Sequence, residues 1–383
     1  MIKIDESLEV SNRILVVCLS ETWGGIEKNV LLRIKKLLER NVSVSLMMLH
    51  NTFEEKFADL EGLNLITVNR RWSDLLPFMY LEVYFVLKKF KPDCVFVALK
   101  RDWWLFSSLS FLLSVPKVVL YLGIYRKIKS NLKYKFLFHT FGSHLLVNSH
   151  WLKEKVMLDN TYLISGNVSM IYNGFEINKS FKQGSSKIMS ELLALKRQGF
   201  FIVGCAGRLS NQKGFDLLPD ILDLLPSDVR IVVVGEGQQR ERLEILFSER
   251  GYSDQIILLG HCQDMLTFYQ NIDLFLLTSR NEGLANVLIE ALANRLPIVA
   301  TNASGSAELI EASDDQLGQG RFNLGQFGLL ADIDDFKGLA NGILVLKDDP
   351  TIIKGNHLEK INNNFHVDQM IDQSLRLFFN HSR

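Results

Sequence analysis

The strongest constraint on the fold of this chain is an alternation of strand-like and helix-like segments through its first half. Continuous apolar runs rich in β-branched residues are typical of strands that are buried on both faces of a sheet. Such runs occupy residues 13–20, 42–49, 63–68, 94–99, 117–123 and 144–148, and helical segments separate most of them. This rhythm predicts a parallel, doubly wound sheet with helices on both faces.

The same rhythm restarts in the second half, after a candidate linker at about 176–199 where the pattern weakens. Strand-like runs there cover residues 201–207, 230–237, 255–260, 273–278 and 297–302. The predicted fold class is therefore α/β, with two Rossmann-like, doubly wound parallel-sheet domains at 1–175 and 176–364. Ligands of such sheets bind beyond the carboxyl ends of the strands, so we expect the two domains to face each other across a cleft.

Charge is distributed unevenly between the two halves. Lys+Arg and Asp+Glu each total 43, and a net charge of zero argues against a bulk nucleic-acid binder. Residues 1–179 hold 24 basic and 17 acidic residues, a net charge of +7, whereas residues 180–383 hold 19 and 26, a net charge of −7. We therefore expect the two domains to have different partners.

The cysteines and apolar segments indicate a compartment. No CxxC pair is present, and three of the four cysteines lie inside apolar runs, as is typical of buried thiols in a reducing compartment; they are Cys18, Cys94, Cys205 and Cys262. The N-terminal residues lack a signal-peptide core, and Pro116 interrupts the longest apolar stretch, Ser107–Tyr125, which is typical of a helix followed by a strand. We expect a cytoplasmic protein, soluble or peripheral at the inner face of the membrane.

Two cations follow the first strand of the second domain. Arg208 and Lys213 lie on a loop, at the strand end where doubly wound sheets bind ligands. The planar guanidinium of arginine matches phosphate oxygens, and lysine adds a compact positive charge. Together they could neutralise a diphosphate without a metal ion; the alternative is two solvated cations on a loop.

A second cluster follows the strand-like run at 273–278. Gly283 opens a predicted helix whose first backbone amides are a natural site for a phosphate or a sugar hydroxyl. Glu282 precedes this helix, and Glu290 lies about two turns along it among apolar residues, where a carboxylate needs hydrogen-bond donors. The hydroxyls of a ribose would serve, although a single glutamate on a helix is more often part of a salt bridge.

These residues and their order resemble the retaining, nucleotide-sugar-dependent glycosyltransferases of family 4, which have the GT-B fold. Glu282 and Glu290, with Arg208 and Lys213 upstream, carry the resemblance. Further matching segments are Gly24-Gly25-Ile26-Glu27, Val147-Asn148-Ser149, Ile171-Tyr172-Asn173-Gly174, Gly305-Ser306-Ala307-Glu308 and Phe327-Gly328-Leu329-Leu330. The likeness is dense over residues 200–335 and thin over 30–140.

The resemblance implies a role for each matching residue. Arg208 and Lys213 would hold the donor diphosphate and stabilise the leaving group, Glu282 would contact the transferred sugar as the third catalytic residue, and Glu290 would bind the ribose. The other donor-binding residues would be Gly25 of the glycine-rich loop and Gly283, Leu284, Ala285 and Asn286 at the helix start. The first domain would bind the acceptor, and a C-terminal helix at 365–383 would pack back on it.

Two differences from the family pattern, and one motif that resembles a metal site, limit which family properties we expect in this chain. Relatives usually have Gly or Pro at the position of Ala285, and many have a His or Asp after the strand corresponding to 117–123, where this chain has no His. Asp332-Ile333-Asp334 is formally a DxD metal motif, but it follows the main donor-site motifs, and no His/Cys cluster has ligand spacing. We therefore expect no metal site, no catalytic His and no cofactor beyond the nucleotide-sugar donor.

The predicted function is hexosyl transfer from a UDP-sugar, a hexose or an N-acetylhexosamine, to a glycan acceptor, with retention and without metal. The acceptor expected is lipid-linked, in surface polysaccharide, lipopolysaccharide or glycan biosynthesis. Two alternatives stay open. A GT-B-type epimerase would isomerise the sugar nucleotide without an acceptor, and a non-catalytic subunit would bind it without turnover.

A basic and aromatic segment of the first domain predicts a membrane partner. Arg126, Lys127, Lys129, Lys133 and Lys135 alternate there with aromatic residues up to position 141, and Arg70-Arg71-Trp72 and Arg101 with Trp103-Trp104 add to the pattern. Such residues suit an anionic bilayer surface or a lipid phosphate. The alternative is an aromatic stripe in the core beneath a solvated basic face.

Overall fold

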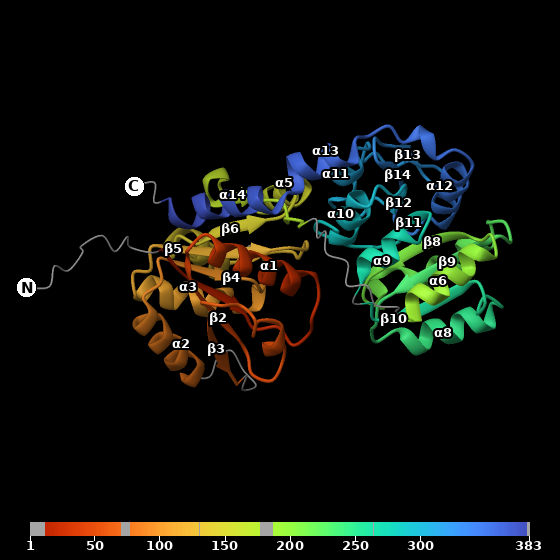
Figure 1. Ribbon diagram of the computed structural model, residues 1–383. Coiled ribbons are helices and arrows are strands. Elements are labelled where there is room, and N and C mark those ends of the chain that lie inside the picture. The colour runs from red at the N-terminus through yellow and green to blue at the C-terminus, as the bar shows by residue number, and fades with distance from the viewer. Residues whose placement is uncertain (1–11, 70–76, 130, 177–186, 263, 381–383) are drawn as a thin grey trace, which may run out of the picture. The chain divides into compact units, whose positions relative to one another are not determined.

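The computed structural model describes residues 12–69, 77–129, 131–176, 187–262 and 264–380. The chain divides into two compact units (Figure 1). The first comprises Met1–Gly174 with Val367–Arg383, and the second comprises Phe175–His366. The core of the predicted linker, at 177–186, and the basic segment Arg70-Arg71-Trp72 lie outside the described residues.

The first unit is built on a seven-stranded sheet in the order β3-β2-β1-β4-β5-β6-β7. All neighbouring strands pair in parallel, because each strand returns through a connection across a face of the sheet. The strands are β1 (Arg13–Cys18), β2 (Ser43–Leu49), β3 (Asn64–Val68), β4 (Cys94–Val97), β5 (Lys117–Leu122), β6 (His144–Val147) and β7 (Val168–Met170).

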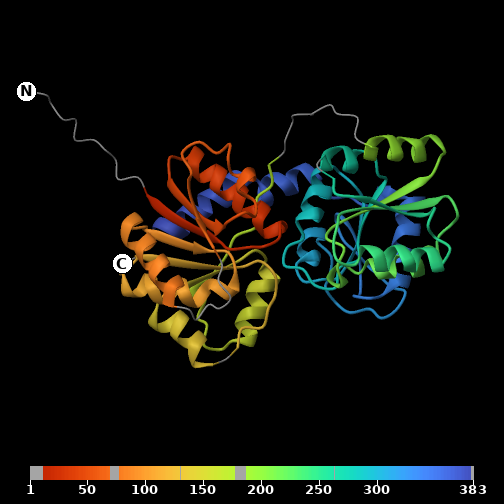
Figure 2. The same cartoon turned by 90° about the horizontal axis from the view of Figure 1, so that it is seen from below.

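Helices cover both faces of this sheet (Figure 2). Helices α1 (Gly25–Glu39) and α14 (Val367–Phe379) pack with the side chains of one face. On the other face lie α2 (Pro77–Phe90), α3 (Trp103–Leu112), α4 (Leu132–Lys135) with the π-helical turn Phe136–Thr140, and α5 (His150–Asp159). The apolar stretch 107–125 thus forms the end of α3 and strand β5, and no described helix is long and apolar enough to cross a bilayer.

Helix α14 is fixed to the first unit by polar contacts as well as by apolar packing. The guanidinium of Arg33 on α1 is 1% exposed and donates to the hydroxyl of Ser374 on α14. At the surface, Arg40 donates to Asp372 at 2.7 Å and to Asp368 at 3.2 Å. These contacts join residues more than 300 positions apart, so the chain returns to its first unit after completing the second.

The second unit repeats the same winding in the order β10-β9-β8-β11-β12-β14-β13. Its strands are β8 (Phe201–Ala206), β9 (Val229–Val234), β10 (Ile256–Gly260), β11 (Leu274–Leu277), β12 (Ile298–Thr301), β13 (Asn323–Leu324) and β14 (Gly328–Ala331). Among the described strands of this sheet, β13 and β14 form the one antiparallel pair. The edge strand β13 was not predicted, because two residues are too few to show a hydrophobic period.

Helices also flank the second sheet on both sides (Figure 2). They are α6 (Lys187–Arg197), α7 (Leu218–Leu222), α8 (Arg240–Glu249), α9 (Met265–Gln270), α10 (Asn286–Ala293), α11 (Ser306–Ile310), α12 (Phe336–Asp348) and α13 (His357–Lys360). The predicted fold class, two parallel-sheet α/β domains of Rossmann type, is confirmed. In each sheet the winding direction reverses between two central strands, β1 and β4 in the first and β8 and β11 in the second, which is where such folds bind ligands.

The turn at Asn173-Gly174 predicts a stability difference between two glycines of the first unit. A Cβ at Gly174 would lie 2.8 Å from the Cα of Val367, so alanine there must push α14 away. We expect Gly174→Ala to lower the free energy of unfolding by about 1–3 kcal/mol in urea titrations. At Gly166 a Cβ meets nothing within 4 Å, so Gly166→Ala is the matched control. An equal loss in both variants would contradict the close approach.

Candidate functional site

The residues predicted for the site come together on two adjacent loops of the second unit. Strands β8 and β11 are hydrogen-bonded neighbours, so the loops that leave their carboxyl ends start side by side. Three further hydrogen bonds join these loops: Thr278 Oγ1 donates to the Lys213 carbonyl at 2.6 Å, the Arg280 amide to the Gln212 carbonyl at 2.8 Å, and Gln212 Nε2 to the Asn281 carbonyl at 2.7 Å. The two loops therefore form one structural element.

Gly214 allows the close approach of these loops. Its φ is +66°, in the left-handed region that favours glycine, and a Cβ there would lie 2.2 Å from the Thr278 carbonyl oxygen. No side chain fits at this distance. The glycine after Lys213 is thus a requirement of the backbone, and it places Lys213 beside the second loop.

Lys213 and Glu282 form an ion pair at the centre of the site. Their Nζ and Oε1 atoms are 2.5 Å apart, and the side chains are only 16% and 8% exposed. A charge this far from water is costly unless an opposite charge compensates it. The sequence predicted both residues for the same site but assigned them to different parts of a ligand; the structure shows each as the partner of the other.

Arg208 lies on the loop after β8. Its side chain is exposed, while the next residue, Leu209, is fully buried. The backbone of Leu209 donates to the Glu236 carbonyl at 3.0 Å and accepts from the Gln239 amide at 3.1 Å. These bonds fix the backbone next to Arg208 just after the carboxyl end of β8.

Glu290 is held by a tyrosine that the sequence analysis missed. The hydroxyl of Tyr269, on α9, donates to Glu290 Oε2 at 2.8 Å. Burial raises the pKa of the Tyr269 phenol well above its ordinary value, and the neighbouring Glu290 carboxylate raises it further. The phenol therefore remains the donor and the carboxylate the acceptor. No local motif marks Tyr269, because it meets Glu290 only through the packing of α9 beside α10.

The start of α10 follows the loop that carries Glu282. Ala285 is the N-cap residue and provides no side-chain hydrogen bond to the helix, so its first N–H groups are not capped by that side chain. The side chains of Leu284 and Ala285 are buried in the unit. Of the predicted donor residues at the helix start, Gly283 to Asn286, these two could therefore reach a ligand only through their backbones.

Arg280 fixes the geometry of both loops and was also missed by the sequence analysis. It donates to Asp216 Oδ1 and Oδ2 at 2.8 Å each, to Asp334 Oδ1 at 2.6 Å and to the Asn211 carbonyl at 2.8 Å. The bonds from Arg280 to its carboxylate hold the pKa of Asp216 below its usual range. A bidentate arginine pair of this kind gives geometric specificity, so Arg280 positions the loop that carries Arg208 and Lys213.

The Asp332-Ile333-Asp334 motif is occupied by the protein itself. Asp332 Oδ2 accepts from the amides of Leu317 at 3.1 Å and Gly318 at 2.9 Å, and Asp334 pairs with Arg280. Both carboxylates thus stabilise loops. Within the described ranges, no group of three or more His, Cys, Asp and Glu side chains is arranged to hold a metal ion.

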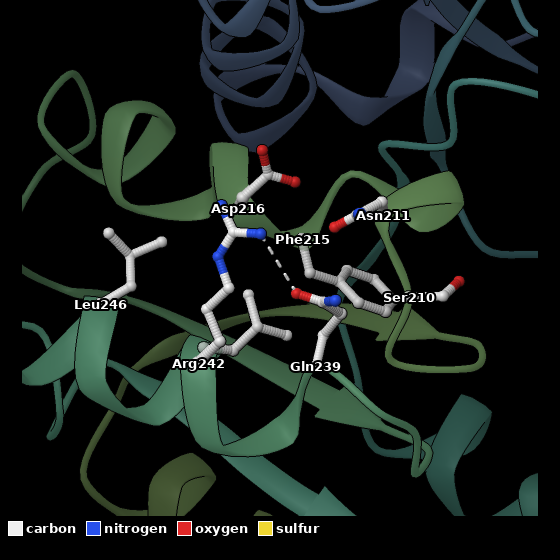
Figure 3. A pocket seen from close by; sticks show the side chains of 8 residues that line it. Ser210, Asn211, Phe215, Asp216, Gln239, Arg242 and Leu246 are labelled. Atoms are coloured by element: carbon white, nitrogen blue, oxygen red, sulfur yellow. Dashed lines mark hydrogen bonds between the residues drawn. The ribbon is translucent and has the colours of Figure 1, made fainter.

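A small pocket lies beside the Arg208–Gly214 loop (Figure 3). It is lined by Ser210, Asn211, Phe215, Asp216, Gln239, Arg242, Leu243 and Leu246. Arg242 donates across it to Gln239 at 3.4 Å. Neither Arg208, Lys213, Glu282 nor Glu290 lines this pocket, so we do not assign it to the donor. Gly25, the remaining predicted donor residue, begins α1 of the first unit, and its contact with a donor stays a prediction.

The sequence and fold of this chain are similar to those of known glycosyltransferases. Residues 194–364 match the family model described as "Glycosyl transferases group 1". The solved structure of Anabaena HepE in complex with UDP and glucose superposes with a TM-score of 0.78, at 21% identity over 96% of this chain and 99% of HepE. WaaG, a glycosyltransferase involved in lipopolysaccharide biosynthesis, superposes with a TM-score of 0.66, at 12% identity over 96% of this chain and 100% of WaaG. The chain has the GT-B fold.

Curated relatives align with part of this chain. The chain is 25% identical over 246 residues to the Staphylococcus aureus capsular polysaccharide biosynthesis glycosyltransferase CapM, and the alignment covers 62% of this chain and 58% of CapM. It is 35% identical over 121 residues to the Rhizobium leguminosarum lipopolysaccharide core mannosyltransferase LpcC, 29% of this chain and 34% of LpcC. The chain therefore spans only about a third to three fifths of these relatives.

A longer alignment is found with an Escherichia coli relative. Its name is UDP-Gal:alpha-D-GlcNAc-diphosphoundecaprenol alpha-1,3-galactosyltransferase, and it is 25% identical over 317 residues, 78% of each chain. Sequence similarity thus extends beyond the second unit, although the family model matches that unit alone.

The Arg280–Asp216 pair predicts a pH-dependent contribution to stability. Because the pKa of Asp216 is lowered in the fold, the pair stabilises fully above the unfolded pKa of about 4 and is lost as the pH falls through the lower folded value. Asp216 is 39% exposed, so solvent screening limits the effect. We expect Asp216→Asn to cost a few tenths to about 1 kcal/mol in urea unfolding at pH 7, with the difference shrinking below pH ~4.

Asp254→Asn, at an exposed position of the same unit, is the control and should match the parent protein at neutral pH. A constant difference between Asp216→Asn and the parent protein from neutral to acid pH would show that Arg280 does not act through the ionised carboxylate.

Proposed function

We propose that this protein is a retaining glycosyltransferase that moves a sugar from a UDP-sugar to a glycan acceptor. The observation that carries the proposal is the joining of two loops at the carboxyl edge of the second sheet, which pairs Lys213 with Glu282. Arg208 lies on the first of these loops, and α10 follows the second. Cations and helix amides at one strand edge form an anion site suited to a diphosphate. A UDP-hexose or UDP-N-acetylhexosamine is the donor that we propose.

The nucleotide would be anchored at Glu290. A half-buried carboxylate needs hydrogen-bond donors, and the two hydroxyls of a ribose can supply them. Tyr269 already holds one oxygen of Glu290 in place, so the carboxylate is oriented before the ligand arrives. Such preorganisation lowers the cost of binding.

The chemistry would rely on stabilising the leaving group. When the bond between the anomeric carbon and the diphosphate oxygen breaks, negative charge grows on the diphosphate and positive charge on the sugar. Arg208, Lys213 and the helix amides would stabilise the negative charge. The acceptor hydroxyl would attack from the leaving-group face and pass its proton to the departing phosphate, so the configuration is retained without a separate protein base.

The acceptor that we propose is a growing glycan on a lipid carrier. The names of relatives support this proposal: the E. coli protein acts on a diphosphoundecaprenol-linked sugar, and CapM takes part in capsule synthesis. HepE is solved with UDP-glucose, which supports the choice of donor. The four buried free cysteines support a reducing compartment, so the reaction would take place at the cytoplasmic face of the membrane.

A donor panel with and without acceptor tests this function. We expect release of free UDP that depends on a lipid-linked acceptor and persists in EDTA. Arg208→Ala should reduce the turnover rate about 10²–10³-fold, because a group that stabilises leaving-group charge is removed. Anomeric configuration of the product, read by NMR, tests retention.

Other outcomes of the same assay identify the alternatives. Sugar isomerisation without acceptor would mean an epimerase, and nucleotide binding without turnover would mean a non-catalytic subunit. Loss of all turnover in EDTA, restored by manganese, would overturn the metal-free mechanism. Glu290→Ala should bind UDP more weakly than the parent protein. Lys337→Gln, at an exposed position on α12, should bind UDP as the parent protein does.

The Lys213–Glu282 pair predicts different effects of two neutralising substitutions on UDP binding. In Lys213→Gln a charge-assisted contact to the diphosphate is lost, so calorimetry should show roughly ten- to a hundredfold weaker binding. In Glu282→Gln the carboxylate that competes with phosphate for Lys213 is neutralised, so UDP should bind as tightly or tighter, while turnover falls. Weaker UDP binding in both variants would show that Glu282 does not compete for Lys213.

A further inference from the structure

The outer surface of three helices in the first unit carries a cluster of large exposed apolar side chains. We call this cluster the apolar helix face. Its members are between 46% and 74% exposed: Phe78, Leu81 and Phe85 on α2, Phe111 and Leu112 on α3, and Leu132 and Phe136 on α4 and the turn that follows. Single exposed apolar residues are ordinary, but a cluster of this size marks an interaction surface.

The members of the apolar helix face are connected in space. Helix α2 packs beside α3 (Figure 1), and α3 packs on the turn after α4. The ring of Phe141 lies 5.3 Å from Phe111 and 6.5 Å from Phe136, so it joins the last two helices. On α2, the spacing of Phe78, Leu81 and Phe85 places them on one side of the helix. All three helices cover the same face of the sheet.

The aromatic segment that the sequence singled out divides between core and surface. Leu137 and Phe138 are buried in the core, whereas Leu132 and Phe136 point outward. The interpretation as a core stripe therefore holds for Leu137 and Phe138 but not for Leu132 and Phe136. The exposed half is what requires an explanation.

Around α4 the charge beside the apolar helix face has one sign, whereas α2 also carries the exposed Glu82. Between positions 124 and 141 the chain has five basic residues and no acidic residue. All five are exposed: Arg126, Lys127, Lys129, Lys133 and Lys135. The ammonium group of Lys133 lies 5.5 Å from the ring of Trp104, so its stem runs along the aromatic surface while its charge stays in water.

We propose that the apolar helix face binds the surface of an anionic phospholipid bilayer. Aromatic and leucine side chains would enter the boundary between headgroups and acyl chains, and the lysines would lie among the phosphates. A second copy of the chain is disfavoured as the occupant, because face-to-face packing would bring the lysine clusters together. The inference does not rest on the proposed activity, since lipid binding requires no sugar donor.

Co-sedimentation of the full chain with vesicles tests this surface. Binding to phosphatidylcholine vesicles that contain phosphatidylglycerol should exceed binding to pure phosphatidylcholine and should weaken in high salt. Lys129→Gln, Lys133→Gln and Lys135→Gln together should reduce partitioning about a hundredfold, since each lysine near an anionic surface contributes about fivefold. Phe111→Ser, Leu132→Ser and Phe136→Ser together should reduce it about tenfold or more, because apolar area no longer inserts.

Matched changes on the second unit serve as controls. Ile245→Ser, at an exposed apolar position of α8, and Lys337→Gln should partition as the parent protein does. The free energy of unfolding of every variant, measured by urea titration, separates loss of folding from loss of lipid binding. Equal binding to neutral and anionic vesicles, or variants that bind as the parent does, would overturn the proposal. So would a concentration-dependent dimer that only the apolar substitutions dissociate, since the occupant would then be a second copy.

Discussion

The adjacency of β8 and β11 in the second sheet is the constraint on which the candidate site depends. Lys213 and Glu282 are 69 positions apart in the chain, yet their side chains meet because the strands before them are hydrogen-bonded neighbours. Gly214 then allows one loop to touch the other, and Arg280 ties both to Asp216 and Asp334. A reversal of winding between two central strands thus becomes a rigid, charged surface at the strand ends.

The sequence predicts those parts of the fold and site that depend on local patterns. Buried strands such as β1 and β8 appear as continuous apolar runs, and Lys213 and Glu282 appear as charged residues just after such runs. Tyr269 and Arg280 could not be found in this way, because their roles arise from packing and hydrogen bonds between distant segments. The sequence could not predict that Phe136 is exposed and Phe138 buried. The π-helical turn changes the helical period from which the buried and exposed sides of a helix are predicted.

The two units share a topology but differ in what they expose. Of the fifteen large apolar side chains exposed in the described residues, ten lie in the first unit, and seven of these form the apolar helix face. The first half of the sequence also carries the net positive charge. The same sheet topology therefore allows the outer helix surfaces of the two units to differ, since the core constrains only the inward-facing side chains. In this chain the exposed apolar side chains gather on helices of the first unit, whereas the Lys213–Glu282 pair lies at a strand edge of the second.

The Lys213–Glu282 pair would couple recognition of the phosphate to recognition of the sugar. A diphosphate that contacts Lys213 shares its ammonium with Glu282, and the half-released carboxylate then needs other hydrogen-bond donors because it is largely buried. The hydroxyls of an attached sugar can supply them, whereas free UDP cannot. The intact donor would therefore satisfy both charges and the product only one. Such a difference would favour binding of the donor over binding of UDP. The Lys213–Glu282 pair would therefore also promote the release of UDP after transfer.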